Sequence, residues 1–146
     1  MRLILASGSK IRAEMLRNAG VDIDVQPADV DEVVIKQQML TEQASVEAIA
    51  LKLADSKAKS VTGDLVLGAD QVLVFEGQLY DKPRSVSDAC EQLKQLRGGT
   101  HELLSAAVIY EKGERVCAQV GHVKLTMRDF RMRFLTPISR PKARNC

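Results

Sequence analysis

The chain has 146 residues, of which 45% are hydrophobic and 27% charged, a balance typical of one soluble globular domain. Its formal net charge of +2 is too small to indicate a polyanionic partner. Aromatic residues make up 3% and tryptophan is absent, so few surfaces are available on which nucleic-acid bases could stack. These values argue against nucleic-acid binding.

Membrane and secretion signals are also lacking in the sequence. It contains no run of 18 apolar residues, and its first residues do not have the layout of a signal peptide. The cysteines Cys90, Cys117 and Cys146 are odd in number and irregularly spaced, which favours reduced thiols. We therefore expect a cytoplasmic protein. A zinc site is not expected, because no CxxC or HExxH pattern occurs and there are two histidines.

The first elements predicted along the chain are a strand, a turn and a helix. Arg2–Ala6 is a short apolar strand, and Ser7-Gly8-Ser9 after it is typical of a turn. The last serine of this turn is predicted to cap a helix over residues 10–18. Ile11 and Met15 are four residues apart and form one apolar face of that helix.

A second strand and a long helix follow. The strand is predicted from three alternating apolar residues and ends at Pro27; they are Val21, Ile23 and Val25. An acidic loop covers residues 29–32. The clearest helix of the chain covers Ser45–Val61, because its apolar residues keep the helical period for over four turns; they are Val46, Ile49, Ala50, Leu53, Ala54, Ala58 and Val61.

Two hairpins with a helix between them are predicted in the second half. The first hairpin covers Leu65–Tyr80 and turns at Glu76-Gly77. The helix starts at Ser85 and directs three residues inward: Cys90, Leu93 and Leu96. The second hairpin pairs Glu102–Tyr110 with Arg115–Thr126. Strands interleaved with helices predict an α/β fold with a mixed sheet.

A carboxylate lies inside the first hairpin. Asp70 directly follows an apolar run that ends at Gly68-Ala69, and strand-forming residues continue after it. Burying an ionised carboxylate without a partner is costly, so Asp70 needs a cation, a hydrogen-bond donor or a catalytic task. The hairpin offers a way to bring Lys82 back towards Asp70. The alternative is that Asp70 simply ends a strand.

The Ser7-Gly8-Ser9 turn combines features of an anion-binding site. Two hydroxyls and free backbone N–H groups lie at the start of a helix, and these groups bind anions in many proteins. Arg12 follows in the first turn of that helix, within reach of such an anion. A capping serine and a surface arginine are more often structural, and that alternative stays open.

Two further charged positions complete a set suited to phosphate chemistry. The pair Asp31-Glu32 suits a hard cation such as Mg²⁺, although an acidic loop is usually solvated. Lys57 lies on the polar side of the long helix, where solvent exposure is the simpler interpretation. Phosphoryl chemistry needs cations for phosphate oxygens, carboxylates for a metal and a base that orients water; the candidates are Arg12, Lys57, Lys82, Glu32 and Asp70. No P-loop motif is present.

Five ordered motifs resemble the Maf family of nucleoside triphosphate pyrophosphatases. The opening LASGSKIRAEML is similar to the LASxSPRRxELL of that family. Four others follow in the family's order: VDE at Val30–Glu32, LADSKA at Leu53–Ala58, GADQVL at Gly68–Leu73 and DKP at Asp81–Pro83. The resemblance covers the chain from about Leu3 to Asp129. It implies a Maf/ITPase-like mixed sheet flanked by helices, and metal-dependent hydrolysis of a nucleotide to its monophosphate and pyrophosphate.

The resemblance also implies site residues and partners. Asp70 is the general base, and Glu32 binds a divalent metal, Mg²⁺ or Mn²⁺, together with Asp70. The residues implied in contacts with substrate and its phosphates are Ser7, Ser9, Arg12, Lys57 and Lys82. Gln71 is at the position that helps select the nucleobase of the substrate. In the family, Thr at this position is found in enzymes for pyrimidine triphosphates, and Gln is often found in enzymes for 7-methyl-GTP or a broader range of nucleotides. A homodimer is the usual assembly.

Two departures from the family pattern affect these expectations. Lys10-Ile11-Arg12 replaces the common Pro-Arg-Arg, so one of the paired arginines is absent, and Lys10 lacks the two-pronged grip of a guanidinium. Family members also continue past the long strand into a helix and a YxIQG segment, whereas this chain becomes basic and proline-broken from Arg131. We expect an incomplete domain over residues 1–129 and a tail over 130–146 that is disordered or translated from a shifted frame.

A shortened domain carries consequences of its own. An exposed sheet edge and an uncovered apolar face are expected. Two alternatives to catalysis remain at this stage: a non-catalytic nucleotide-binding protein that regulates septum formation, and an inactive short form.

Overall fold

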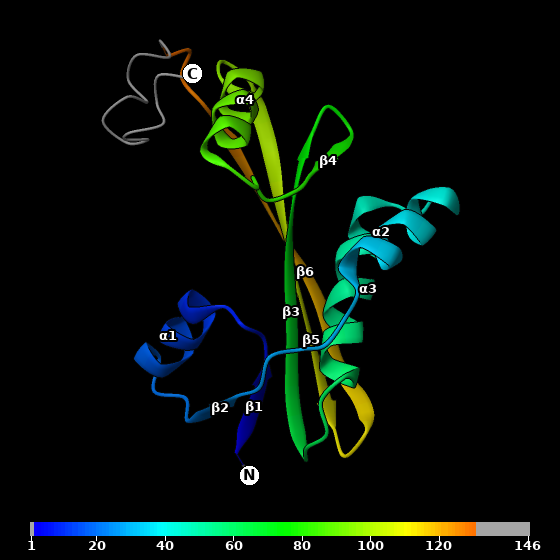
Figure 1. Ribbon diagram of the computed structural model, residues 1–146. Coiled ribbons are helices and arrows are strands. Elements are labelled where there is room, and N and C mark those ends of the chain that lie inside the picture. Colours follow the sequence, from blue (N-terminus) through cyan, green and yellow to red (C-terminus); the bar gives the residue numbers. More distant parts are fainter. Residues whose placement is uncertain (1, 131–146) are drawn as a thin grey trace. The chain divides into compact units, whose positions relative to one another are not determined.

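The computed structural model describes residues 2–130 and shows an α/β fold with a mixed sheet, as predicted (Figure 1). The predicted tail from residue 131 lies outside the described residues, so its character stays a prediction. The described helices are α1 (Lys10–Asn18), α2 (Glu32–Thr41), α3 (Val46–Lys59) and α4 (Val86–Leu96). The described strands are β1 (Leu3–Ala6), β2 (Ile23–Val25), β3 (Leu65–Phe75), β4 (Gln78–Tyr80), β5 (Thr100–Glu111) and β6 (Glu114–Thr126).

The chain divides into two compact units, each described by itself. The first unit extends to Gln71 and includes Leu104–Gly121. It holds β1, β2, the first part of β3 and the neighbouring parts of β5 and β6, in the strand order β2-β1-β3-β5-β6. β1 runs parallel to both of its neighbours, and its last residue, Ala6, lies opposite Gly68 of β3.

In the first unit, α1 and α3 cover opposite faces of β1 and β3 (Figure 1). Leu5 belongs to a buried cluster with Ala13 of α1, whereas Ala6 belongs to a cluster with Ala58 of α3. Consecutive residues of a strand point to opposite faces, so this division follows from the pleat of β1. The site described below is on the α3 face.

Three of the described helices begin at serine N-caps, and the cap at Ser9 is the predicted one. Ser9 accepts a hydrogen bond from the backbone N–H of Arg12, at 3.3 Å. Ser45 and Ser85 cap α3 and α4 in the same way, each at 3.1 Å. Such caps contribute about 1 kcal/mol each because they satisfy backbone donors that the helix leaves unpaired.

The buried face of α1 differs from the predicted one. Ile11 and Met15 are 73% and 62% exposed, and the helix instead directs Ala13 and Leu16 towards the sheet. A helix turns by about 100° per residue, so residues 13 and 16 share a face that residues 11 and 15 do not. Apolar spacing therefore located the helix but not its inner face.

The predicted acidic loop contains the start of a helix, α2, that the sequence analysis did not predict. Asp31 is its N-cap and accepts a hydrogen bond from the backbone N–H of Val34, at 3.2 Å. Glu32 is the first residue of the helix. α2 buries none of its residues and begins with a β-branched run, so neither periodicity nor propensity indicated a helix.

Within the described residues, the second unit contains Val72–Leu103 and residues 122–130. β3 and β4 form an antiparallel hairpin in which Leu73 lies opposite Tyr80. Its turn is the predicted pair Glu76 and Gly77, both with positive φ (52° and 78°), as a two-residue type I′ turn requires. α4 buries two of the predicted residues, Cys90 and Leu96.

The structure bears on the expectations about membrane-spanning segments and free thiols. No helix within residues 2–130 is long and apolar enough to cross a membrane. Cys117 is an exposed free thiol, as expected.

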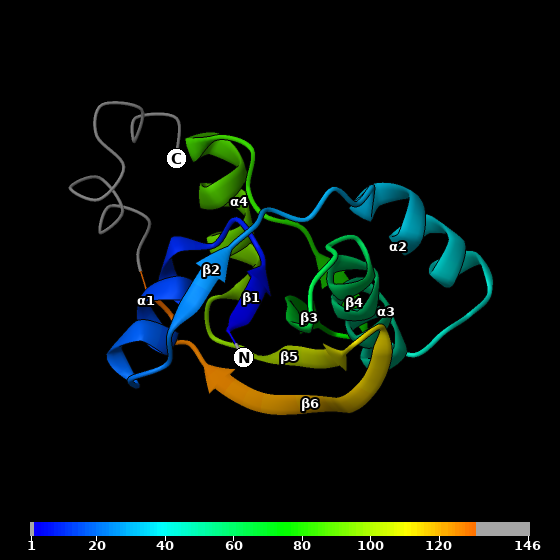
Figure 2. The same cartoon turned by 90° about the horizontal axis from the view of Figure 1, so that it is seen from below.

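β6 follows β5 and is the last strand in the order (Figure 2). Almost all of its residues are exposed. Val116, Val123 and Leu125 are apolar side chains that are 56%, 53% and 41% exposed. The expected exposed edge with apolar side chains is therefore present on β6.

Candidate active site

Lys57 lies between two carboxylates in the first unit. Its Nζ is 2.7 Å from Oδ1 of Asp70 and 2.7 Å from Oε1 of Glu32. The side chains of Lys57 and Asp70 are 15% and 10% exposed, and that of Glu32 is 44% exposed. The interpretation of Lys57 as a solvent-facing residue is therefore wrong, and three of the predicted site residues form one cluster.

Gly68 allows α3 to approach β3 closely enough for this contact. A Cβ atom at Gly68 would lie 2.2 Å from the carbonyl oxygen of Ala54 and 2.7 Å from the backbone nitrogen of Ala58. Side chains two residues apart share a face of a strand, so Asp70 lies on the same face as Gly68. The helix backbone therefore rests on the strand at Gly68, and Lys57, next to Ala58, reaches Asp70.

Asp70 does not end a strand, so that alternative is wrong. β3 continues without interruption from Leu65 to Phe75, and Asp70 is 8% exposed in its middle. The cation that this buried carboxylate requires is Lys57. Lys82 is exposed and belongs to the second unit, and its predicted approach to Asp70 stays a prediction.

The charge of Lys57 is maintained by its partners. Burial lowers the pKa of the Lys57 ammonium, but hydrogen bonds to Asp70 and Glu32 and the negative charges of both outweigh burial and raise the pKa above its ordinary value. Lys57 is therefore a cation at neutral pH. Two carboxylates and one ammonium thus lie together in the first unit.

The predicted anion-binding turn is held together by its own side chains. Ser7 is buried, and its Oγ accepts hydrogen bonds from the backbone N–H of Ser9 and from Nη1 of Arg12, both at 3.1 Å. Arg12 therefore folds back over the turn. A guanidinium has five N–H donors, of which the contact with Ser7 uses one, so Arg12 keeps donors for an anion.

A cavity of about 240 Å³ joins this turn to the charged cluster. β1 ends at Ala6, which lies opposite Gly68 of β3. Gly68 is two residues before Asp70, so the turn that follows Ala6 starts close to the charged cluster. Ligands in open α/β sheets bind at such carboxyl ends of parallel strands. The cavity is lined by Ser7, Gly8, Pro27, Ala28, Val30, Glu32 and Lys57.

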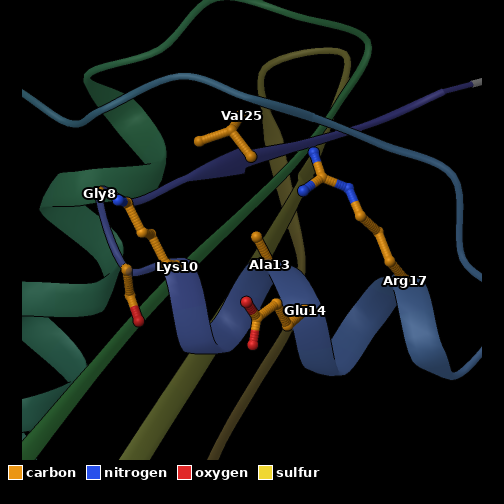
Figure 3. A pocket seen from close by; sticks show the side chains of 7 residues that line it. Gly8, Lys10, Ala13, Glu14, Arg17 and Val25 are labelled. Carbon is orange, nitrogen blue, oxygen red and sulfur yellow. The ribbon is translucent and has the colours of Figure 1, made fainter.

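A second cavity, of about 370 Å³, lies along α1 beside the same turn (Figure 3). Figure 3 shows Lys10 and Arg17 extending from α1 near its two ends, with Ala13 between them and Val25 of β2 on the other side. The lining also includes Gly8, so the two cavities adjoin the same glycine. Charged groups at this cavity are of both signs, since Glu14 lines it as well.

Gln71 follows Asp70 in β3, but its side chain lies on the other face of the sheet. The two residues are consecutive in β3, so their side chains point to opposite faces. Gln71 is exposed and shares its face with Leu67, which packs against the cluster on the α1 side. The structure thus does not bring Gln71 to the side of Asp70, and its contact with substrate stays a prediction.

The donor set of the cluster fits a hard divalent cation. Oδ1 of Asp70 and Oε1 of Glu32 both contact one ammonium, so a single cation reaches both oxygens. Among residues 2–130, no group of three or more His, Cys, Asp and Glu side chains is arranged to hold a metal. Two carboxylates suit Mg²⁺, which keeps several waters and is commonly completed by substrate phosphates.

A second charge cluster, formed around the buried Asp55, was not predicted. Asp55 of α3 accepts a hydrogen bond from the Tyr110 hydroxyl at 2.5 Å, and its carboxylate lies 3.2 Å from Lys59 and 3.8 Å from Arg115. Burial raises the pKa of Asp55, but the Tyr110 hydrogen bond and the two cations outweigh it and lower the pKa below its ordinary value. The sequence feature that could have indicated this cluster is an aspartate, Asp55, among the apolar residues of the long helix.

Comparison with known proteins identifies the family. The family model described as "Maf-like protein" matches residues 2–139. A nucleoside triphosphate pyrophosphatase of Ruegeria sp. (strain TM1040) is 50% identical over 130 residues, which cover 86% of this chain and 65% of that protein. A 7-methyl-GTP pyrophosphatase of Mesorhizobium japonicum is 42% identical over 131 residues, covering 87% and 66%. The chain thus spans about two thirds of the length of these curated relatives.

Solved structures support the fold. The Staphylococcus aureus Ham1 protein aligns with a TM-score of 0.56 at 15% identity, covering 88% of this chain and 73% of that one. A HAM1 protein from Coxiella burnetii aligns with a TM-score of 0.51 at 16% identity, covering 85% and 70%. The architecture is therefore of the expected Maf/ITPase-like class. From the family match and the identity to its relatives, the chain belongs to the Maf-like protein family.

Proposed function

We propose that the chain hydrolyses a nucleoside triphosphate to its monophosphate and pyrophosphate. The observation that carries this proposal is the cluster of Glu32, Lys57 and Asp70 at the cavity that also reaches the Ser7 turn. The names of the relatives support it, since they are nucleoside triphosphate and 7-methyl-GTP pyrophosphatases. The substrate is therefore a nucleotide, and its triphosphate binds at the turn.

In the proposed reaction, a water oxygen attacks the α-phosphorus of the nucleotide. Asp70 is the proposed general base: Oδ1 contacts Lys57 in the metal-free chain, and Oδ2 is the oxygen that accepts the proton of that water. The bond from the α-phosphorus to the oxygen bridging to the β-phosphorus breaks, and its electron pair leaves with pyrophosphate. Arg12, Lys57 and Lys82 bind phosphate oxygens, and Ser7 and Ser9 shape the turn that receives them.

Glu32 and Asp70 are the proposed ligands of the divalent cation, Mg²⁺ or Mn²⁺. When bound, such an ion neutralises the charge that develops on the phosphate oxygens. Gln71 takes part in selecting the base and favours a purine or a broad range over strict use of dTTP and UTP. The proposed assembly is a homodimer.

The replacement Asp70→Asn tests the proposal. It keeps the shape of the side chain but removes the base, so turnover is expected to fall by about 10²–10⁴-fold, the usual contribution of general base catalysis. Nucleotide binding is expected to persist, because the phosphate-binding residues are unchanged. The measurement is pyrophosphate release with and without Mg²⁺, together with a nucleotide-binding isotherm.

The matched control is Asp64→Asn, an exposed aspartate just before β3 in the same unit. We expect this variant to retain the turnover of the parent chain. Equal turnover of Asp70→Asn and the parent would show that Asp70 is not the base. Nucleotide binding by the parent without any product would favour the non-catalytic, regulatory alternative instead.

A further inference from the structure

We propose that Lys57 is an internal counter-ion that a divalent cation displaces, so that its ammonium is released to the phosphates when the metal binds. This inference rests on the proposed use of Glu32 and Asp70 as metal ligands. It assigns Lys57 two successive sets of partners: the two carboxylates in the metal-free chain, and the substrate phosphates in the loaded one.

The first support is the position of the ammonium. Nζ of Lys57 is 2.7 Å from an oxygen of Glu32 and 2.7 Å from an oxygen of Asp70. A magnesium ion shared by these carboxylates would need oxygens at about 2.1 Å, between which the ammonium now lies. Two cations cannot occupy that space together, so Lys57 has to move when a metal takes both oxygens.

The second support is burial. The side chain of Asp70 is 10% exposed and faces a second carboxylate, that of Glu32, across the same ammonium. Two such carboxylates without a cation would repel each other, and the buried one would have lost most of its hydration. Lys57 supplies a positive charge to the buried Asp70 in the metal-free chain and contacts Glu32 with the same ammonium.

The third support is the space open to the released side chain. Lys57 lines the cavity of about 240 Å³ together with Ser7 and Gly8 of the anion-binding turn. Lysine has a flexible four-carbon stem and a point charge with three donors, so its ammonium can turn from the carboxylates to an anion in that cavity. Lys57 therefore couples the two binding events: release from the carboxylates frees it for phosphate.

The first test measures Mn²⁺ affinity by calorimetry for the parent and for Lys57→Met. Removing the competing ammonium is expected to raise the association constant by about tenfold or more, because a unit charge a few ångströms from a divalent ion is strongly repelled. Lys59→Met is the matched control, since Lys59 lies on the same helix, pairs with Asp55 and is 58% exposed. Unchanged or weaker Mn²⁺ binding by Lys57→Met would overturn the inference.

The second test uses the parent chain, in case Lys57→Met does not fold. Lys57 and Lys59 are acetylated with an amine-reactive ester, and the rate at each residue is followed by mass spectrometry with and without Mn²⁺. Mn²⁺ is expected to increase the rate at Lys57 several-fold and to leave Lys59 unchanged. No increase at Lys57, including the case in which the chain binds no Mn²⁺, would overturn the inference.

These outcomes are separable from those of the proposed function. Metal-dependent pyrophosphate release without faster acetylation of Lys57 would leave the pyrophosphatase in place and refute the displacement. Faster acetylation without any pyrophosphate release would support the displacement and refute the activity.

Discussion

Gln71 is the residue that we propose takes part in selecting the nucleobase of the substrate. It is adjacent in sequence to Asp70 but lies on the opposite, α1-facing side of β3. A side chain there can influence which base is accepted without changing the charged cluster around Asp70. Replacing Gln71 is therefore expected to change the relative rates with different nucleotides, and not the proposed transfer of a proton from water to Asp70.

We predict that the chain hydrolyses purine triphosphates, including 7-methyl-GTP, and is not confined to dTTP and UTP. The variant Gln71→Thr should shift the ratio of kcat/KM for pyrimidines to that for purines by about tenfold, the effect of one altered pocket contact. The measurement is pyrophosphate release from a panel of common and modified nucleotides. Turnover of the parent restricted to dTTP and UTP would contradict this prediction.

Single residues differ in how far the sequence reveals their role. The caps at Ser9, Ser45 and Ser85 were predictable because a cap bonds within three residues of itself. Lys57 was not, because its partners Glu32 and Asp70 come from other elements, and helical position alone indicated solvent exposure. Resemblance to a family placed these three residues in one site before any contact between them was known.

Among the elements of the first unit, α3 supplies both Lys57 of the candidate site and the buried Asp55. Its apolar residues fill the space above the sheet, Lys57 reaches the site, and Asp55 bonds to Tyr110 of β5 and pairs with Arg115 of β6. The Asp55 cluster therefore holds α3 against two further strands. The contribution of the Asp55 cluster to the stability of the fold depends on the ionisation of the Asp55 carboxyl group.

We predict that part of the stability of the chain is lost in acid through Asp55. The pKa of Asp55 is lower in the folded chain than its ordinary value of 3.8, so its stabilising contribution is present above pH 3.8 and lost as pH falls through the lower folded value. Asp55→Asn should cost about 1–3 kcal/mol of unfolding free energy at pH 7, because the Tyr110 hydroxyl then loses its hydrogen bond to a charged acceptor. The difference from the parent should shrink towards pH 3.

Urea unfolding at pH 7 and pH 3 measures this difference, with the exposed Asp22→Asn as the control. A loss of stability in Asp55→Asn that is equal at both pH values would contradict the prediction, because a purely steric effect does not titrate. An equal effect of Asp22→Asn would assign it to net charge instead of to the Asp55 cluster.

Elements were predictable where local chemistry is strong. Both hairpin turns carry a glycine after a residue that adopts positive φ, Gly77 after Glu76 and Gly113 after Lys112, and both were located from sequence. α2 was missed because it buries no residue, so no apolar stripe marks it. The charged cluster depends on that missed helix, since Glu32 begins it.

At the scale of the whole molecule, the exposed strand β6 is the feature that most favours association with other chains. It ends the strand order, and Val116 and Val123 are more than half exposed on it. Terminal strands with free backbone groups and apolar side chains tend to pair with other chains.

We predict that the chain forms species larger than a dimer as its concentration rises. The double variant Val116→Lys, Val123→Lys should reduce them in sedimentation velocity, because lysines on a terminal strand oppose strand pairing. Its unfolding free energy should stay within about 0.5 kcal/mol of the parent, since both sites are exposed. The control is Val33→Lys, Val34→Lys on α2, where the valines are 61% and 55% exposed but lie on a helix. An equal effect of the control would assign association to surface hydrophobicity in general, and a parent that is no larger than a dimer at every concentration would refute the role of β6.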